Sequence, residues 1–380
     1  MTTSEFGTTL KVKIYGESHS AKIGCSVKGF PLGFKIDKEK LNQFLIRRTS
    51  SHNPWDTPRH ELDIPYFVSG VSSDGIITDS TITAEIDNTS IRPSDYQETE
   101  FIPRPGHADF SAWAKWGDNY KHTGGGHFSA RLTAPLCVAG GIALQILQSQ
   151  KISVVAHVSQ IKNIKDTPFE LIDNSLAAHA KLLSQISQLQ ETTQDTSLPF
   201  ISKDVARKTK VLLTALRKNK ETTGGKVECV VIGLPAGIGN PHFQGLENVI
   251  STAIFGIPAV KGIEFGSGMN AATLTGSENN DAYVLQNGKV VPKTNHAGGI
   301  LGGISTGAPL WFTCAFKPIS SIGVPQQSVN LKTLTPTTLT IHGRHDVTAV
   351  LRAVPCVESA CALALLDVLY TWPSQRKRSK

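Results

Sequence analysis

Five short apolar runs rich in β-branched or aromatic residues predict β-strands along the chain. They span residues 8–14, 80–86, 151–158, 226–233 and 310–316. Such side chains suit the pleated surface of a sheet. The sequence therefore predicts strands distributed over most of the chain.

Four longer segments carry apolar residues at helical spacing and predict α-helices. These segments are residues 129–148, 174–190, 204–220 and 347–370. The third is followed by Gly224 and Gly225, a pair that favours a helix stop. Residues 191–199 have the composition of a linker, but they lie between two predicted helices and not between two evident cores. We therefore expect an α+β fold in a single domain over residues 1–380.

Composition places the chain among globular proteins. It has 380 residues, of which 39% are hydrophobic and 18% charged, enough for a large buried core. The first residues lack the features of a signal peptide, and no run of about 18 apolar residues predicts a membrane span. The six cysteines include no CxxC pair, which argues against a disulfide framework and a zinc site. We therefore expect a cytoplasmic protein without a membrane partner.

A net charge of +7 and an isoelectric point near 9.0 favour anionic partners. Arginine and histidine recur inside apolar or glycine-rich segments, where a buried cation requires a counter-charge that a bound anion can supply. The basic tail, residues 375–380, is short and has no aromatic residues for stacking on bases. We expect a solvated terminus there and no nucleic-acid partner.

Common cofactor motifs find little support. Residues 266–271 (GSGMNA) match a loose dinucleotide fingerprint, but no helix follows to hold a pyrophosphate. The chain has no GxxxxGK[ST] phosphate loop. His342 and His345 have only Asp346 close by as a further metal ligand, so no metal is expected.

Five polar clusters carry more chemistry. They are GESHS (16–20), RPGHAD (104–109), GGGHFSAR (124–131), KPISSI (317–322) and GRHD (343–346). The first follows a predicted strand, the third leads from glycines into a predicted helix, and the fourth sets a lysine beside two hydroxyls. Backbone amides at a helix start and such a lysine both suit a phosphate. Asp346 lies just before the last predicted helix, where it could simply serve as an N-cap.

Together with Arg47–Arg48, AVKGIEFGSG (259–268) and NHAGGILGGISTG (295–307), these clusters resemble the chorismate synthase family over essentially the whole chain. The resemblance implies antiparallel β-sheets and packed helices in a β-α-β sandwich. It also implies reduced FMN as a cofactor for the 1,4-anti elimination of phosphate from 5-enolpyruvylshikimate 3-phosphate, which gives chorismate without net redox change. Family members are typically homotetramers.

The resemblance also implies roles for individual residues. His19 matches the histidine that protonates the reduced flavin, His107 the one that gives a proton to the departing phosphate, and Asp346 the base that takes the ring proton. Arg48, Arg131 and Arg344 match arginines expected on the anionic substrate, with Arg344 also at the flavin boundary. The residues implied for FMN are His127, Phe128, Ser129, Pro258, Ala259, Gly302, Lys317, Pro318, Ile319, Ser320 and Ser321.

Departures from the family pattern limit some of these assignments. His127 replaces an arginine, so we expect a weaker or remodelled flavin contact there. Pro54 replaces an arginine associated with NADP, so NADPH is expected at most as an indirect reductant, with a separate flavin reductase possible. An FMN-dependent reductase remains the alternative, and steady NADPH consumption during turnover would favour it. A basic nucleic-acid-binding protein is a further alternative, which a steep salt dependence of binding would support.

Overall fold

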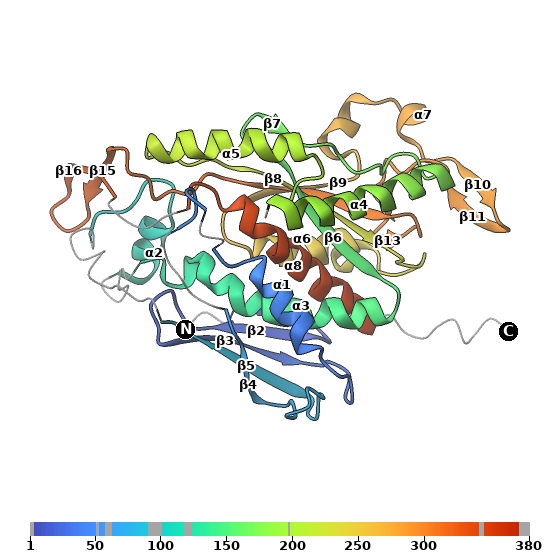
Figure 1. The fold of residues 1–380 in the computed structure, drawn as a ribbon, viewed down its shortest axis with the longest axis horizontal. Helices are drawn as coiled ribbons and strands as arrows, with labels where there is room; N and C mark the ends of the chain where they lie inside the picture. The colour runs from blue at the N-terminus through green and yellow to red at the C-terminus, as the bar shows by residue number, and fades with distance from the viewer. Residues whose placement is uncertain are drawn as a thin grey trace.

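Two five-stranded antiparallel sheets enclose a layer of helices (Figure 1). The computed structural model describes residues 4–50, 53–57, 63–89, 101–117, 124–196, 198–341 and 346–371. The first sheet has the order β1-β2-β3-β5-β4, and the second has the order β7-β6-β8-β14-β9. The predicted α+β class and the β-α-β sandwich are both confirmed.

The strands of the first sheet are β1 (Glu5–Phe6), β2 (Lys11–Tyr15), β3 (Lys22–Lys28), β4 (Tyr66–Ser69) and β5 (Thr81–Asp87). Those of the second sheet are β6 (Ser153–Ile161), β7 (Ile164–Lys165), β8 (Gly225–Ile232), β9 (Val260–Phe265) and β14 (Leu310–Phe316). Three hairpins pair β10 (Tyr283–Gln286) with β11 (Lys289–Pro292), β12 (Ile300–Leu301) with β13 (Ile304–Ser305), and β15 (Gln326–Asn330) with β16 (Thr335–Leu339). All five predicted strands are present.

The helices are α1 (Lys38–Ile46), α2 (Asp109–Trp116), α3 (Thr133–Ser149), α4 (Leu176–Thr196), α5 (Lys203–Lys218), α6 (Leu246–Phe255), α7 (Gly276–Asn279) and α8 (Val350–Thr371). All four predicted helices are present. The linker predicted over residues 191–199 was wrong for its first part, because α4 continues through Thr196. The hydroxyl of Thr192, which is fully buried, donates to Gln188 O at 2.9 Å and to Ile201 O at 3.3 Å, and so joins the C-terminal part of α4 to the segment before α5.

Helices α3 and α8 form the centre of the molecule, between the two sheets (Figure 1). Residues Ala130–Ser149 and Val350–Thr371 are long and apolar enough to cross a membrane, but their most apolar windows are 72% and 89% buried inside the protein. A helix that is apolar all round belongs in such a core. Gly140 allows α3 to approach α8 closely, because a Cβ atom there would lie 2.1 Å from the Cβ of Ser359.

An ion pair joins the end of α1 to α8 and to the second sheet. Arg47 Nη1 and Nη2 donate to the two carboxylate oxygens of Glu358 at 2.7 and 2.9 Å, and Ala156 N donates to Glu358 at 2.9 Å. Such bidentate pairs fix orientation as well as distance. Because Arg48 directly follows Arg47, the Arg47–Glu358 ion pair also fixes the position at which Arg48 enters the protein interior.

Candidate active site

A cavity of about 550 Å³ opens where the ends of several elements meet, within the size range of small-molecule sites. Its wall combines Arg48 after α1, the segments before α2 and α3, the segment between α6 and β9, the residues after β14 and the first turns of α8. Element ends carry backbone and side chains that the core does not use for packing. The fold therefore gathers polar residues from distant parts of the sequence here.

The cavity carries an excess of positive charge. Five cationic side chains and two carboxylates line it: Arg48, Arg104, Arg131, Lys317 and Arg352, with Asp63 and Asp346. Three of the arginines and Lys317 come from the polar clusters and arginine pair that the sequence singled out. An anionic ligand would complete the charge balance of such a site.

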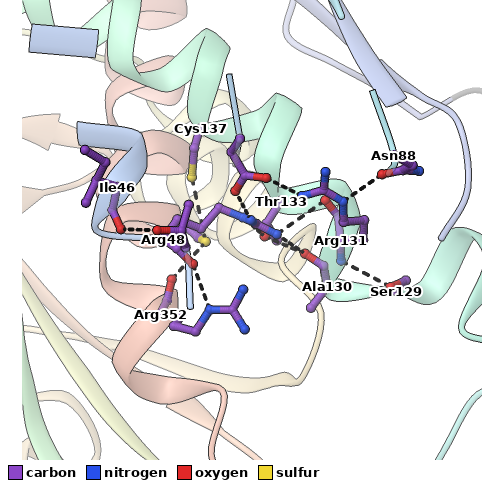
Figure 2. Close-up of polar contacts among 12 residues, drawn as sticks. Ile46, Arg48, Asn88, Ser129, Ala130, Arg131, Thr133, Cys137 and Arg352 are labelled. Carbon is purple, nitrogen blue, oxygen red and sulfur yellow. Dashed lines mark hydrogen bonds and ion pairs between the residues drawn. The ribbon is translucent and has the colours of Figure 1, made fainter. Parts of the chain in front are cut away.

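Arg48 and Arg131 lie side by side because both form an ion pair with Asp63 (Figure 2). All three residues are buried. Arg48 Nε also donates to Thr133 Oγ1 at 2.9 Å, and Arg131 Nε donates to Asn88 Oδ1 at 2.8 Å. These contacts hold two guanidinium groups in fixed positions at the cavity wall (Figure 2).

The same contacts keep this cluster charged. Burial, the largest single effect, would lower the pKa of Arg48, but the charge and hydrogen bond of Asp63 and the effects of neighbouring groups together outweigh it, and the pKa is raised. Burial alone would raise the pKa of Asp63, but the charges of Arg48 and Arg131 outweigh it and the pKa is lowered. Two cations and one anion therefore remain, which leaves one positive charge for a ligand.

His107 is held by a carboxylate. Its Nδ1 lies 2.5 Å from Asp109 Oδ1, and Asp109 is also bound by Arg104 through contacts of 2.7 Å from Nε and 2.9 Å from Nη2. Asp109 is 1% exposed, whereas the His107 side chain is 17% exposed and lines the cavity. A carboxylate on one ring nitrogen fixes the orientation of an imidazole and so positions the other nitrogen for proton transfer. The arrangement suits a group that donates a proton.

Asp346 also lines the cavity, just before α8, and its two carboxylate oxygens have different partners. Thr57 N donates to Oδ1 and Arg352 Nη1 donates to Oδ2, both at 2.8 Å. These contacts join Asp346 to the segment of Thr57 and to a side chain of α8. A second carboxylate is close, since burial and then the charge of Asp346 raise the pKa of Asp56.

The RPGHAD and KPISSI clusters contact each other although they are far apart in sequence. Lys317 Nζ donates to Gly106 O at 2.8 Å and to Ser320 Oγ at 2.6 Å, and Arg104 Nη1 donates to Ser321 Oγ at 3.2 Å. Burial, followed by the charge of Lys261, lowers the pKa of Lys317. A neighbouring anion, such as a phosphate group, would stabilise the charged form of this lysine.

The GESHS turn contacts the glycine-rich turn before α3. Ser18 N donates to Gly126 O at 3.2 Å, and His127 Nε2 lies 3.1 Å from Glu17 Oε1. Both side chains of this second contact are about half exposed. Ser18 lines the cavity, which puts His19 one residue from its wall.

Most of the predicted site residues meet in this one cavity. Those that line it are Arg48, His107, His127, Phe128, Ser129, Arg131, Pro258, Ala259, Lys317, Ile319, Ser320, Ser321 and Asp346. Pro318 stands between two lining residues, and His19 follows one. Arg344, and with it most of the GRHD cluster, lies outside the described residues.

Gly302 is not among the residues that line the cavity. It lies at the exposed turn of the β12–β13 hairpin with φ +61°, and a Cβ atom added there would meet nothing within 4 Å. The geometry of this cavity therefore gives no support to the predicted contact between Gly302 and a flavin. The turn itself explains the residue, since glycine adopts positive φ without strain.

The rest of the NHAGG segment serves the packing of the second sheet. Asn295 is 1% exposed, accepts a hydrogen bond from Gly299 N at 2.7 Å and donates to Pro309 O at 2.9 Å. A Cβ atom at Gly298 would lie 2.4 Å from Gly266 N. Because these glycines have no side chains, their backbone packs closely between the loop that follows β9 and the start of β14.

Sequence reasoning missed Asp63, Arg352 and the residues at the end of α6, which are Phe255, Gly256 and Ile257. Asp63 sits in a stretch without periodicity or motif, so no local signal marked it. Arg352 did carry a signal, because it is a lone cation near the start of a largely apolar helix. Such a charge requires a partner or a function.

Comparison with known proteins shows to which family the chain is related. The sequence profile of the chorismate synthase family matches residues 10–370. The chorismate synthase of Lancefieldella parvula is 65% identical over 376 residues, which cover 99% of this chain and 98% of that protein. The chorismate synthase of Methanococcus vannielii is 37% identical over 365 residues, which cover 96% of this chain and 95% of that protein. A crystal structure of a chorismate synthase has a similar fold, with a TM-score of 0.72 at 23% identity, over 96% of this chain and 92% of that one.

Proposed function

The chain belongs to the chorismate synthase family of lyases, and from this premise we propose that it converts 5-enolpyruvylshikimate 3-phosphate to chorismate by 1,4-anti elimination of phosphate. The observation that carries the proposal is the meeting of a proton donor, a carboxylate base and paired arginines in one cavity. His107, Asp346 and the Arg48–Arg131 pair come from four separate segments. A substrate with one phosphate and two carboxylates requires such a site.

The cationic wall binds and orients the substrate. Arg48 and Arg131 are held by Asp63, so their guanidinium groups present fixed donors for a carboxylate or phosphate. Pre-formed positions reduce the entropy that is lost when the substrate binds. The reacting carbons are then held between the proton donor and the base.

His107 and Asp346 manage the protons. His107, oriented by Asp109, donates a proton to the phosphate as the bond to the allylic carbon breaks. Asp346, held by Thr57 N and Arg352, accepts the hydrogen that leaves the ring as a proton. The phosphate leaves protonated, and the ring gains the second double bond of the diene.

We propose that the same cavity binds reduced FMN, and its residues fit this group. Phe128, Ile257, Ala259 and Phe316 supply apolar surface for a planar ring system, and Lys317 with Ser320 supplies donors for a phosphate. His19 stands beside the wall, where it could hold a proton close to the ring. Reduced FMN, when bound, supplies electron density to the substrate transiently and recovers it, so that no net redox change results.

Anaerobic turnover tests the proposal. Protein mixed with photoreduced FMN and 5-enolpyruvylshikimate 3-phosphate should release phosphate and form chorismate in equal amounts. Chorismate is followed by absorbance and phosphate by a colorimetric assay, with an otherwise identical reaction on oxidised FMN as the control. The absence of both products would overturn the assignment, and steady NADPH oxidation without chorismate would favour an FMN-dependent reductase.

We further propose a cytoplasmic homotetramer. Phe243 and Phe255 are 87% and 53% exposed and line one groove with Ile263 and Phe265, and such a contiguous apolar surface favours burial against further copies of the chain. All six cysteines are free and buried, as suits a reducing compartment. Light scattering after size-exclusion chromatography measures the mass in solution, and a monomer would contradict the tetramer.

A further inference from the structure

Two thiols meet directly behind the cavity wall. Cys356 Sγ on α8 lies 3.8 Å from Cys137 Sγ on α3, which donates to it (Figure 2). Cys356 is 3% exposed and lines the cavity, whereas Cys137 is fully buried behind it. The pair therefore has one sulfur that a small molecule in the cavity can reach and a second within contact distance of the first.

The surroundings favour the thiolate form of Cys356. The hydrogen bond from Cys137 lowers the pKa of Cys356, which burial would raise, and the positive charge of Arg48 acts in the same direction as the hydrogen bond. Burial raises the pKa of Cys137, so that this partner keeps its proton. The thiolate is the reactive form of cysteine, and reactive cysteines occur next to cationic groups.

A second thiol pair provides an internal comparison. Cys229 on β8 and Cys361 on α8 also form a side-chain hydrogen bond, and both are fully buried. Of the cysteines in the described residues, only Cys356 lines the cavity. Access to the cavity, and not the pairing of thiols alone, thus distinguishes the Cys137–Cys356 pair.

We propose that Cys356 and Cys137 form a site of reversible oxidation, at which a peroxide that enters the cavity converts the two thiols to a disulfide. In the first step the Cys356 thiolate attacks one peroxide oxygen, the O–O bond breaks, and Cys356 becomes a sulfenic acid while one water is released. In the second step the Cys137 sulfur attacks the Cys356 sulfur, the S–O bond breaks, and a second water is released. Two thiols and one hydrogen peroxide thus give one disulfide and two waters.

Disulfide formation should disturb the anion site. The two sulfurs must approach by about 1.8 Å to reach the bond length of about 2.05 Å, which draws α3 and α8 together. Thr133 at the start of α3 and Arg352 on α8 both contact Arg48. Movement of either helix therefore shifts Arg48 at the cavity wall. This effect on turnover rests on the proposed function, whereas the oxidation itself does not.

The test treats the folded protein with hydrogen peroxide, blocks the remaining thiols under denaturing conditions and maps the peptides by mass spectrometry. The expected result is the loss of two of the six thiols and a peptide that links Cys137 to Cys356. Turnover should fall roughly 10²-fold, the cost of a binding group misplaced by about 1 Å, and should return with dithiothreitol. Peptide mapping requires no turnover, so a failure of the proposed reaction would not be confused with a failure of this proposal.

Three variants sharpen the test. Cys356→Ser should keep all its thiols at the same peroxide dose, and Cys137→Ser should stop at a sulfenic acid on Cys356 that dimedone traps. Cys361→Ser is the matched control and should still form the Cys137–Cys356 disulfide. A Cys229–Cys361 disulfide that forms equally fast in the wild-type protein, or the loss of thiols only after unfolding, would overturn the proposal.

Discussion

Single carboxylates decide the orientation of the cationic groups at this site. Asp63 holds Arg48 and Arg131, and Asp109 holds His107 and Arg104. Each carboxylate is almost fully buried, so a neutral replacement would leave its partners with uncompensated charge. The residues that touch a ligand therefore depend on residues behind them that do not.

Replacing His107 by Ala tests the proton donor. Turnover should fall by roughly 10²- to 10⁴-fold because a positioned acid is lost, while FMN affinity changes little. Turnover is measured in the anaerobic assay, and FMN affinity by fluorescence quenching. His179→Ala on α4, at an exposed position, is the control and should retain full turnover. A His107 variant that no longer binds FMN would show a structural role instead.

Elements beyond the site are joined to the second sheet by a buried charge cluster. His157 on β6 is fully buried, with Nδ1 3.2 Å from Asp166 Oδ2 and Nε2 2.9 Å from Glu228 Oε2. Asp166 also accepts from Ile201 N at 2.6 Å and from Ser202 N, the N-cap of α5, at 3.0 Å. This cluster fastens the segment before α5 to the sheet.

The His157 cluster should make stability depend on pH. Burial, the largest single effect, would lower the pKa of His157, but the hydrogen bonds to Asp166 and Glu228 and the charges of these two carboxylates together outweigh it and raise the pKa. Because the folded state holds the proton more tightly, this stabilisation is fully present below the unfolded pKa of about 6.5 and is lost as pH rises through the higher folded pKa. The loss of unfolding free energy in His157→Gln should therefore be larger at low pH than at high pH.

Denaturant unfolding at several pH values measures this difference. His179→Gln is the matched control, and its unfolding free energy should stay within about 0.5 kcal/mol of the wild type throughout, as for most surface substitutions. Equal destabilisation of His157→Gln at every pH would contradict a charged His157.

The whole molecule brings distant elements together around one electropositive cavity, so an anion should stabilise the folded state. Inorganic phosphate should raise the melting temperature, since a ligand at ten times its Kd adds about 1.4 kcal/mol to the unfolding free energy. Potassium chloride at matched ionic strength should not reproduce the rise. Arg131→Gln should lose most of the effect, whereas Arg207→Gln, at an exposed position on α5, should keep it. A rise that is equal in both variants would place phosphate elsewhere.

The sequence by itself determined five of the strands, four of the helices and the polar clusters, most of which contribute to the cavity. Strand and helix patterns are local, because they depend on side chains a few positions apart, and the predicted segments formed where expected. Clusters such as RPGHAD and KPISSI were also visible, because each sets charged or hydroxyl side chains beside a residue that interrupts regular structure. The prediction failed where local composition misled, as for the last turns of α4, which tertiary packing of Thr192 keeps helical.

Only the tertiary structure decided which charges meet. Asp63 lies 68 positions from Arg131, and Cys137 lies 219 positions from Cys356, so no local pattern relates them. Their contacts arise because α3 and α8 pack between two sheets whose strands come from distant parts of the chain. The same packing leaves Gly302 on an exposed hairpin outside the cavity. Local periodicity sets what each segment becomes, whereas burial of the shared core sets which segments become neighbours.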